Sequence, residues 1–171
     1  MRYMLLLMAT FFPFGTGVAE EADFYAHWGD GKAELSSYKV VQPRYGELRE
    51  GYGVLVFVTE DINRETFIKV ESPTPKKDRV YALKLNNVLK FTTGIYDYSV
   101  MTSVFSAVEG LESNNPFEFC KITLSAQEWC GHVFEEVQAR QGRLQGALVL
   151  VQRELEFSTV FLSIQKRRKI S

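Results

Sequence analysis

The sharpest chemical constellation in the chain is the pair Cys130 and His132, which one glycine separates. On a β-strand, residues two apart point to the same face, so the thiol and the imidazole would lie side by side. An imidazole beside a thiol stabilises the thiolate and creates a nucleophile. The pair therefore offers a thiol-dependent enzyme as one alternative. A buried cysteine beside a hydrogen-bonded histidine is the plainer interpretation, because no orienting group or oxyanion site is recognisable.

Two further sets of polar side chains are weaker candidates for chemistry. The conceivable metal ligands are His27, Asp97, Cys130 and His132. Their spacing matches no recognised ligand pattern, and the chain holds only two histidines, so neither a metal nor a cofactor is expected. The carboxylates considered for acid–base work are Glu47, Glu50 and Glu60. Without a diagnostic spacing, we expect them to be solvated positions on strands.

Cations and aromatic side chains on the expected strands are candidates for ligand binding. Tyr96 and Tyr98 stand two apart, so both rings would line one face and could stack on a ligand. Packing of the two rings against neighbouring strands is the alternative. Three cations lie among aromatic and β-branched residues and could bind an anionic head group or a glycan: Arg44, Lys84 and Lys90.

The first nineteen residues have the order of a secretory signal peptide. A positive start at Arg2 precedes an apolar run, and the segment ends in the small residues Gly17-Val18-Ala19. We expect cleavage after Ala19 and export to the periplasm or beyond the cell. A retained anchor is the alternative, but the apolar run is shorter than the roughly 20 residues of a spanning helix. No later stretch is apolar enough to span a bilayer, so no transmembrane span is expected after cleavage.

The chain holds two cysteines, Cys120 and Cys130. Outside the cytosol such a pair can oxidise, which makes a disulfide between them a candidate. A closed loop this short would contribute roughly 2–3 kcal/mol if it is unstrained. The geometry that a disulfide needs cannot be read from spacing, so the pairing stays open.

The composition describes one folded, nearly neutral domain. Removal of residues 1–19 from the 171 leaves enough chain to bury a core, and 46% of the residues are hydrophobic and 13% aromatic. Lysine and arginine number 20 against 21 acidic residues. This balance provides no broad electrostatic surface for nucleic acid, so no nucleic-acid partner is expected.

Short apolar runs separated by turn residues predict a chain of strands. Seven strands are expected at residues 33–42, 45–50, 54–59, 66–70, 79–93, 95–108 and 117–125. Turns are expected at 51–53 and 61–64, a turn or bulge at Asn86-Asn87, and a polar surface loop at 72–78. Residues 126–140 fit either a helix or a strand, and further strand-like runs cover 147–151 and 155–164.

The predicted fold class is therefore mainly β. We expect an antiparallel meander that forms a curved sheet, a half-barrel or a sandwich, with at most one short helix besides the helix of the signal peptide.

Several ordered motifs between residues 27 and 137 resemble a known family. They include Arg44-Tyr45-Gly46-Glu47, Leu83-Lys84-Leu85-Asn86, Thr93-Gly94-Ile95-Tyr96-Asp97-Tyr98-Ser99 and Gln127-Glu128-Trp129-Cys130-Gly131-His132. In that order they resemble an uncharacterised family of exported bacterial proteins, some of which carry a septum-formation-inhibitor label. The resemblance implies no established activity. It ends near Gly142, so we expect a β-rich domain over 20–145 and an atypical tail over 146–171, truncated or frame-shifted.

Together these features predict an exported, non-enzymatic β-domain protein. It would bind an apolar or amphiphilic small molecule or a protein of the cell envelope, because strands such as 54–58 carry more apolar side chains than one buried face requires. The thiol-dependent enzyme at Cys130 and His132 is one alternative. A structural fragment of a longer protein, without activity of its own, is the other.

Overall fold

The structure is a computed structural model of the chain, and it describes residues 18–113, 115–129, 131–151 and 161–170. The described part is mainly β, as predicted, with one helix, α1 (Val18–Trp28), and one 3-10 turn, η1 (Lys76–Asp78). The strands are β1 (Ala33–Arg44), β2 (Glu47–Asn63), β3 (Arg79–Thr93), β4 (Tyr96–Ala107), β5 (Glu118–Glu128), β6 (Gly131–Arg140), β7 (Arg143–Val151) and β8 (Phe161–Ile170). Residues 1–17 of the predicted signal peptide lie outside the described residues, and its last two residues, Val18 and Ala19, begin α1.

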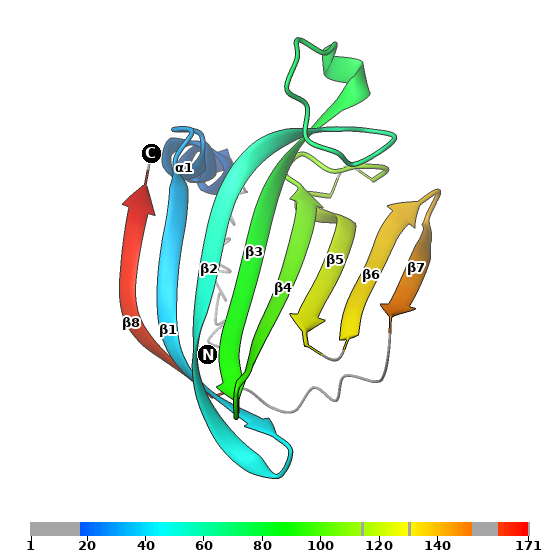
Figure 1. Cartoon of the computed structure of the whole chain (residues 1–171). Coiled ribbons are helices and arrows are strands. Elements are labelled where there is room, and N and C mark those ends of the chain that lie inside the picture. The colour runs from blue at the N-terminus through cyan, green and yellow to red at the C-terminus, as the bar shows by residue number, and fades with distance from the viewer. Residues whose placement is uncertain (1–17, 114, 130, 152–160, 171) are drawn as a thin grey trace, which may run out of the picture.

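All eight strands form one open antiparallel sheet (Figure 1), in the order β7-β6-β5-β4-β3-β2-β1-β8. Strands β1 to β7 each lie beside their successor in the chain, which is the predicted meander. Strand β8 returns to pair with β1, so β7 and β8 are the two edges. A single open sheet matches the curved-sheet form of the prediction rather than a sandwich.

Tight turns join the long strands. Tyr45 and Gly46, between β1 and β2, have φ of 53° and 73°, the left-handed values that a two-residue hairpin loop of type I′ requires. Pro43, the residue after the expected strand 33–42, lies inside β1 opposite Leu48. The turn therefore begins two residues later than the sequence predicts.

The expected turn at 51–53 is wrong, because β2 runs without interruption from Glu47 to Asn63. The glycines serve close packing instead of a turn. A Cβ on Gly51 would lie 2.3 Å from the carbonyl oxygen of Lys90 and 2.8 Å from Cβ of Phe91. Only glycine allows β3 to approach β2 this closely.

Other differences from the sequence prediction are local. Asn86 and Asn87 lie in regular pairs inside β3, so neither a turn nor a bulge forms there. Residues 66–70 are not a strand, since only Lys69 forms an isolated bridge, to Ile62. The polar loop at 72–78 is confirmed, with η1 at its end, and the open choice at 126–140 resolves to strands β5 and β6.

The register divides the sheet residues between two faces, because directly paired residues in an antiparallel sheet point the same way. Face A carries Val40, Gly51, Phe91 and Tyr98, which lie in one row across β1 to β4. Face B is the opposite face. We call the end with the turn at Tyr45 and Gly46 the lower end and the end where β2 stops the upper end, as Figure 1 is drawn.

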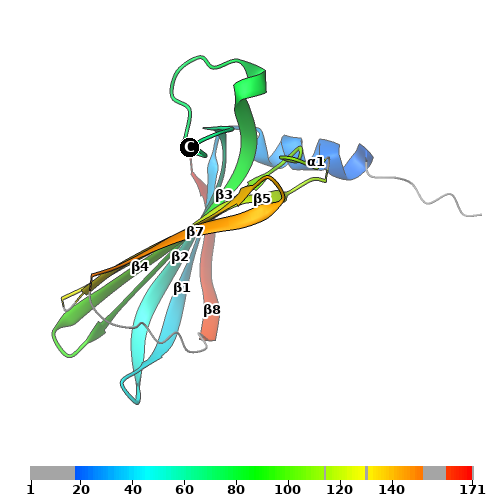
Figure 2. The same cartoon turned by 90° about the vertical axis from the view of Figure 1, so that its right-hand side faces the viewer.

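At the upper end, the sheet buries face B. The buried cluster there, which we call the upper core, contains Ile62, Phe67, Val80, Ala82, Phe105, Ala107 and Cys120. Phe67 belongs to the connection between β2 and β3, which folds over this end of the sheet (Figure 2). Face A of the same end carries α1: the Trp28 ring lies 5.9 Å from that of Phe57, and the Tyr25 ring stacks on Tyr81. No helix of the described residues is long and apolar enough to cross a membrane.

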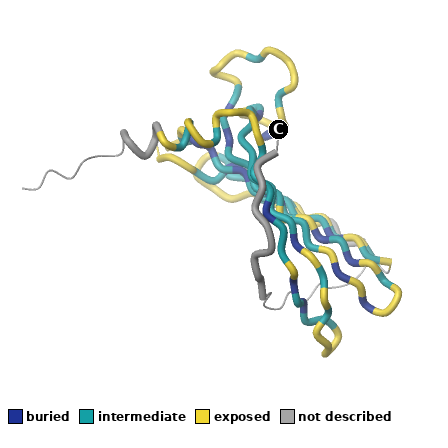
Figure 3. The backbone as a smooth tube through the Cα atoms, turned by 90° about the vertical axis from the view of Figure 1, so that its left-hand side faces the viewer, coloured by how far each residue is buried: buried dark blue, intermediate teal, exposed yellow. Residues whose placement is uncertain are grey.

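At the lower end, the sheet buries face A instead. Its buried residues, which we call the lower core, are Val40, Gln42, Phe91, Thr93, Tyr98, Val100 and Ala126. Figure 3 shows buried positions in both halves of the sheet. One sheet therefore supports two small cores on opposite faces.

Candidate ligand-binding face

Between α1 and the lower core, face A presents an apolar band. Its members come from β2 to β6: Leu55, Phe57, Leu83, Leu85, Leu89, Val104, Ile122, Leu124, Val133 and Val137. All ten side chains are partly exposed rather than buried. The register pairs Phe57 with Leu85, Leu85 with Val104, Val104 with Ile122 and Ile122 with Val137, which makes one apolar row across five strands. In the next row towards the lower end, Asn87 and Thr102 lie between Leu55 and Leu124, so the band is interrupted there by polar side chains.

An aromatic and cationic group lies at the lower end of face A. The hydroxyl oxygens of Tyr45 and Tyr98 are 2.9 Å apart, and the Tyr98 ring stacks on Phe91 with centroids 4.8 Å apart. The guanidinium carbon of Arg44 lies 4.6 Å from the Tyr45 ring centroid and 5.3 Å from that of Tyr98. Tyr98 is 2% exposed and Tyr45 is 66% exposed, so Tyr45 is the outer ring of this group.

Four buried polar atoms at this end have no hydrogen-bond partner, and they are all such side-chain atoms in the described part of the chain. They are Gln42 Oε1, Arg44 Nε, Arg49 Nε and Thr93 Oγ1, and we call their residues the polar cluster. All four residues point to face A by the register. A buried polar atom without a partner is costly, and four in one place indicate a site that is completed from outside the chain.

The charges of the polar cluster are unequally matched. Arg49 Nη2 lies 2.6 Å from Glu47 Oε2. Arg44 has no carboxylate within ion-pair distance among the described residues, and its Nη2 donates to the Tyr45 hydroxyl at 3.5 Å. Burial lowers the pKa of Arg44, but the Tyr98 and Tyr45 hydroxyls outweigh this, so its pKa is raised and it stays charged.

The Tyr98 hydroxyl remains a hydrogen-bond donor at neutral pH. Its pKa is raised from 10.0, first by burial and then by the hydrogen bond with Tyr45, although Arg44 opposes the shift. A protonated phenol can both donate and accept, and the Tyr98 hydroxyl uses this capacity in its hydrogen bond with Tyr45.

The structure brings three of the five predicted ligand-binding residues to face A: Arg44, Tyr96 and Tyr98. The Tyr96 ring packs 5.2 Å from that of Trp129, which is 64% exposed. Lys84 and Lys90 lie on face B, paired with Val58 and Tyr52, and so belong to no common site with Tyr98.

Lys84 has partners of its own on face B. It lies 3.2 Å from Glu60 and 5.2 Å from the Phe105 ring centroid, and Lys121 approaches the same ring at 4.6 Å. Burial lowers the pKa of Lys121. These contacts stabilise the centre of face B, and Lys84 has its partners, Glu60 and Phe105, within the fold.

The structure describes only one of the two cysteines. Cys130 lies outside the described residues, so both the pair with His132 and the disulfide with Cys120 stay predictions. His132 is exposed on face B. Cys120 is a free, buried cysteine at the upper end of β5, whereas Glu128 ends that strand at the lower end. Burial raises the pKa of the Cys120 thiol to about 11, which leaves little thiolate at neutral pH.

The considered metal ligands and carboxylates lie apart. Within the described ranges, no three His, Cys, Asp or Glu residues are grouped to hold a metal ion. His27 lies 3.5 Å from Glu34, and Asp97 accepts a hydrogen bond from Thr92. Glu50 is exposed on face B.

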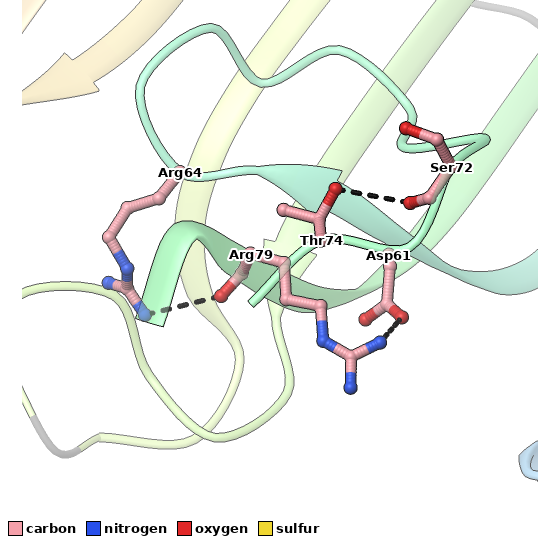
Figure 4. A network of polar contacts seen from close by, with 5 residues as sticks. All are labelled: Asp61, Arg64, Ser72, Thr74 and Arg79. Carbon is pink, nitrogen blue, oxygen red and sulfur yellow. Dashed lines mark hydrogen bonds and ion pairs between the residues drawn. The ribbon is translucent and has the colours of Figure 1, made fainter. Parts of the chain in front are cut away.

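A polar cleft of about 340 Å³ lies at the upper end, beside α1. Its charged groups are matched within the fold (Figure 4): Arg79 pairs with Asp61 at 2.6 Å, and Arg64 donates to the carbonyl oxygens of Lys77, Leu111 and Arg79. The Tyr25 hydroxyl donates to Glu109. These contacts hold the connection between β2 and β3 in place. We therefore assign the polar groups of the cleft a structural role.

The protein is an open antiparallel sheet, and face A of this sheet carries an apolar band that ends in a polar cluster. Comparisons with family models, with curated proteins and with solved structures return no match. The apolar band and the polar cluster are therefore the features of the chain that bear on its function.

Proposed function

We propose that the chain binds an apolar or amphiphilic small molecule along the apolar band of face A. The observation that carries the proposal is the row of ten partly exposed apolar side chains on adjacent strands. Covering apolar surface releases about 25 cal/mol for each Å² removed from water. A large exposed apolar patch on a folded domain is characteristic of a binding surface.

The two ends of the band bound the length of a ligand that lies along one strand. α1 packs on face A at one end, where Thr59 donates a hydrogen bond to the carbonyl of Trp28. At the other end Tyr45 reaches Tyr98. From Leu83 to Leu89 the intervening stretch of β3 is about 20 Å long, which suits an extended hydrocarbon chain.

We propose also that the chain is exported. The support is the signal-like order of residues 1–19, of which residues 1–17 lie outside the described residues. N-terminal sequencing of the protein from a cell-envelope fraction should start at Glu20. A start at Met1 in that fraction would contradict cleavage.

Ligand binding is tested with a neutral fluorescent probe, N-phenyl-1-naphthylamine, and two matched variants. Leu85→Gln places an amide in the band, whereas Val88→Gln changes a partly exposed residue of the same strand on face B. We expect Leu85→Gln to weaken probe binding about tenfold, the loss of one apolar contact, and Val88→Gln to change it less than twofold. Equal effects in variants that both keep the wild-type circular dichroism would refute the proposal.

Native mass spectrometry of protein from its own envelope provides a second readout. An added mass that survives native spray and disappears on denaturation would identify the bound molecule. Protein without added mass that also fails to bind the neutral probe would leave the band without a ligand and contradict the proposal.

A further inference from the structure

We infer that the polar cluster binds the carboxylate head group of a single-chain amphiphile, with Arg44 as the anchoring cation. The inference rests on the proposed function, because the hydrocarbon chain of the same molecule would lie on the apolar band. It goes further in assigning the charge, the chemistry and the orientation of the ligand.

Arg44 lacks a partner for part of its guanidinium. The guanidinium carbon lies 4.6 Å from the Tyr45 ring centroid and 5.3 Å from that of Tyr98, and Nε is buried without a hydrogen-bond partner. A buried N–H of a charged group without an acceptor is costly, and an anion would supply that acceptor. The planar guanidinium fork matches a carboxylate in a two-bond arrangement, and Nε is one of the donors that this arrangement uses.

The donors and charges of the cluster also favour a singly charged anion. Of the four unpartnered atoms, Arg44 Nε, Arg49 Nε and Thr93 Oγ1 can donate, and only Gln42 Oε1 is restricted to accepting. Glu47, which lies opposite Arg44 in the strand register, forms its ion pair with Arg49, so Arg44 keeps no ion-pair partner among the described residues. Because Glu47 and Glu128 already place negative charge near Arg44 and Tyr98, a carboxylate is favoured over a doubly charged phosphate monoester.

The polar cluster is continuous with the apolar band along β3. Phe91, in the lower core, is followed on the same face by Leu89, the exposed Asn87, and then Leu85 and Leu83 of the band. From Phe91 to Leu83 this row is about 27 Å long. A head group at the polar cluster would therefore direct its chain towards α1.

Calorimetric titration with dodecanoate, dodecan-1-ol and acetate tests the inference on the full chain. Dodecanoate should bind at least about tenfold more tightly than dodecan-1-ol, since a charge-assisted pair adds to the same apolar contact. Acetate, which has the head group without the chain, should show no binding at millimolar concentration. Dodecan-1-ol should still bind, because the band alone accepts it.

Two variants and one control assign the charge recognition to the cluster. Arg44→Gln should remove the preference for dodecanoate and leave dodecan-1-ol unchanged within about twofold. Lys39→Gln, an exposed cation of β1 on face B, should retain the full preference. Thr93→Val removes an unpartnered hydroxyl, so it should leave the melting temperature unchanged or higher while weakening dodecanoate.

The outcomes separate the two proposals. If dodecan-1-ol binds and dodecanoate binds no more tightly, the carboxylate inference fails and the proposed function stands. If neither amphiphile binds, the proposed function fails. A preference for dodecanoate that persists in both Arg44→Gln and Thr93→Val would overturn the assignment to this cluster, and Thr93→Val decides the matter if Arg44→Gln does not fold.

Discussion

At the scale of single residues, Glu118 fixes the connection between β4 and β5. Its Oε2 accepts hydrogen bonds from the backbone N–H groups of Leu111, Glu112 and Ser113 at 2.8, 3.1 and 2.9 Å, and from the Ser113 hydroxyl. These donors, led by the Leu111 amide, hold the pKa of Glu118 below its ordinary value of 4.5. One carboxylate oxygen thus organises a loop that has no regular structure of its own.

The lowered pKa makes a prediction about acid stability. Because the folded state favours the ionised form, Glu118 stabilises the fold above about pH 4.5, and this contribution disappears as the pH falls through the lower folded pKa. Glu118→Gln should therefore lower the urea midpoint at pH 7 and lose less stability than the wild type between pH 5 and pH 3. The exposed Glu71→Gln serves as control and should follow the wild type. Identical acid profiles for Glu118→Gln and the wild type would rule out this role.

Cys120 leads to a prediction about thiol chemistry. In a Cys130→Ser background it is the single thiol, and its pKa is raised from 9.0 to about 11 by burial. At neutral pH a thiol-reactive probe should label the folded protein at least about a hundredfold more slowly than the urea-unfolded chain, as two pKa units alone dictate. Labelling at the unfolded rate would show that the upper core is open.

At the scale of elements, the connection between β2 and β3 is a cover for the upper core. Asn63 Oδ1 accepts the N–H groups of Glu65 and Thr66, which turns the chain so that Phe67 enters the core with φ of 53°. The guanidinium of Arg140 lies 3.8 Å from the Phe67 ring centroid on the outer side. The buried Phe67 ring thus adds to the hydrogen bonds of Arg64 and to the isolated bridge at Lys69 in holding the connection.

Adjacent residues of this connection provide a matched test. Phe67 is 1% exposed and Ile68 is 64% exposed. Phe67→Ala should reduce the free energy of unfolding by about 3–5 kcal/mol, because it leaves a cavity in the upper core. Ile68→Ala should change it by less than about 0.5 kcal/mol. Chemical unfolding followed by circular dichroism measures both, and similar losses would show that Phe67 does not fill the core.

Element prediction from the sequence succeeds where local pattern decides. Over residues 95–108 the side chains alternate with the two-residue period of a strand, and this local pattern is enough to predict β4. The glycines at 51 and 53 mislead, since their function is the approach of another strand, which only tertiary structure reveals. The segment 66–70 has strand composition, but the positive φ of Phe67 and its burial make it a cover.

The candidate site is predictable only in part, because tertiary structure decides which residues come together. Tyr96 and Tyr98 share a face by their spacing, as expected. That Arg44 joins them while Lys84 does not depends on the register between strands, which no single segment encodes. Gln42, Arg49 and Thr93 escape sequence reasoning, because polar residues on a strand are ordinarily exposed and nothing in their spacing reveals burial.

At the scale of the whole molecule, the sheet is the shared wall of two cores. Strands β2 and β3, with 17 and 15 residues, pass through both. The upper core lies on face B and the lower core on face A, and the apolar band occupies the opposite side of the wall from much of the upper core. A ligand on the band therefore lies against strands that both cores hold in place, which suits a preformed surface.

The topology also has a consequence for the order in which the chain is assembled. Strands β1 to β7 join through successive hairpins, which close only short loops, whereas β8 must return across the whole domain to β1. Until it arrives, the outer amides of β1 form an open template for any strand. In hydrogen exchange, the amides of β3 should be the slowest, and those that β1 shares with β8 should exchange faster and together. Uniform protection across β1 and β3 would mean that β8 docks with the rest as a single cooperative unit.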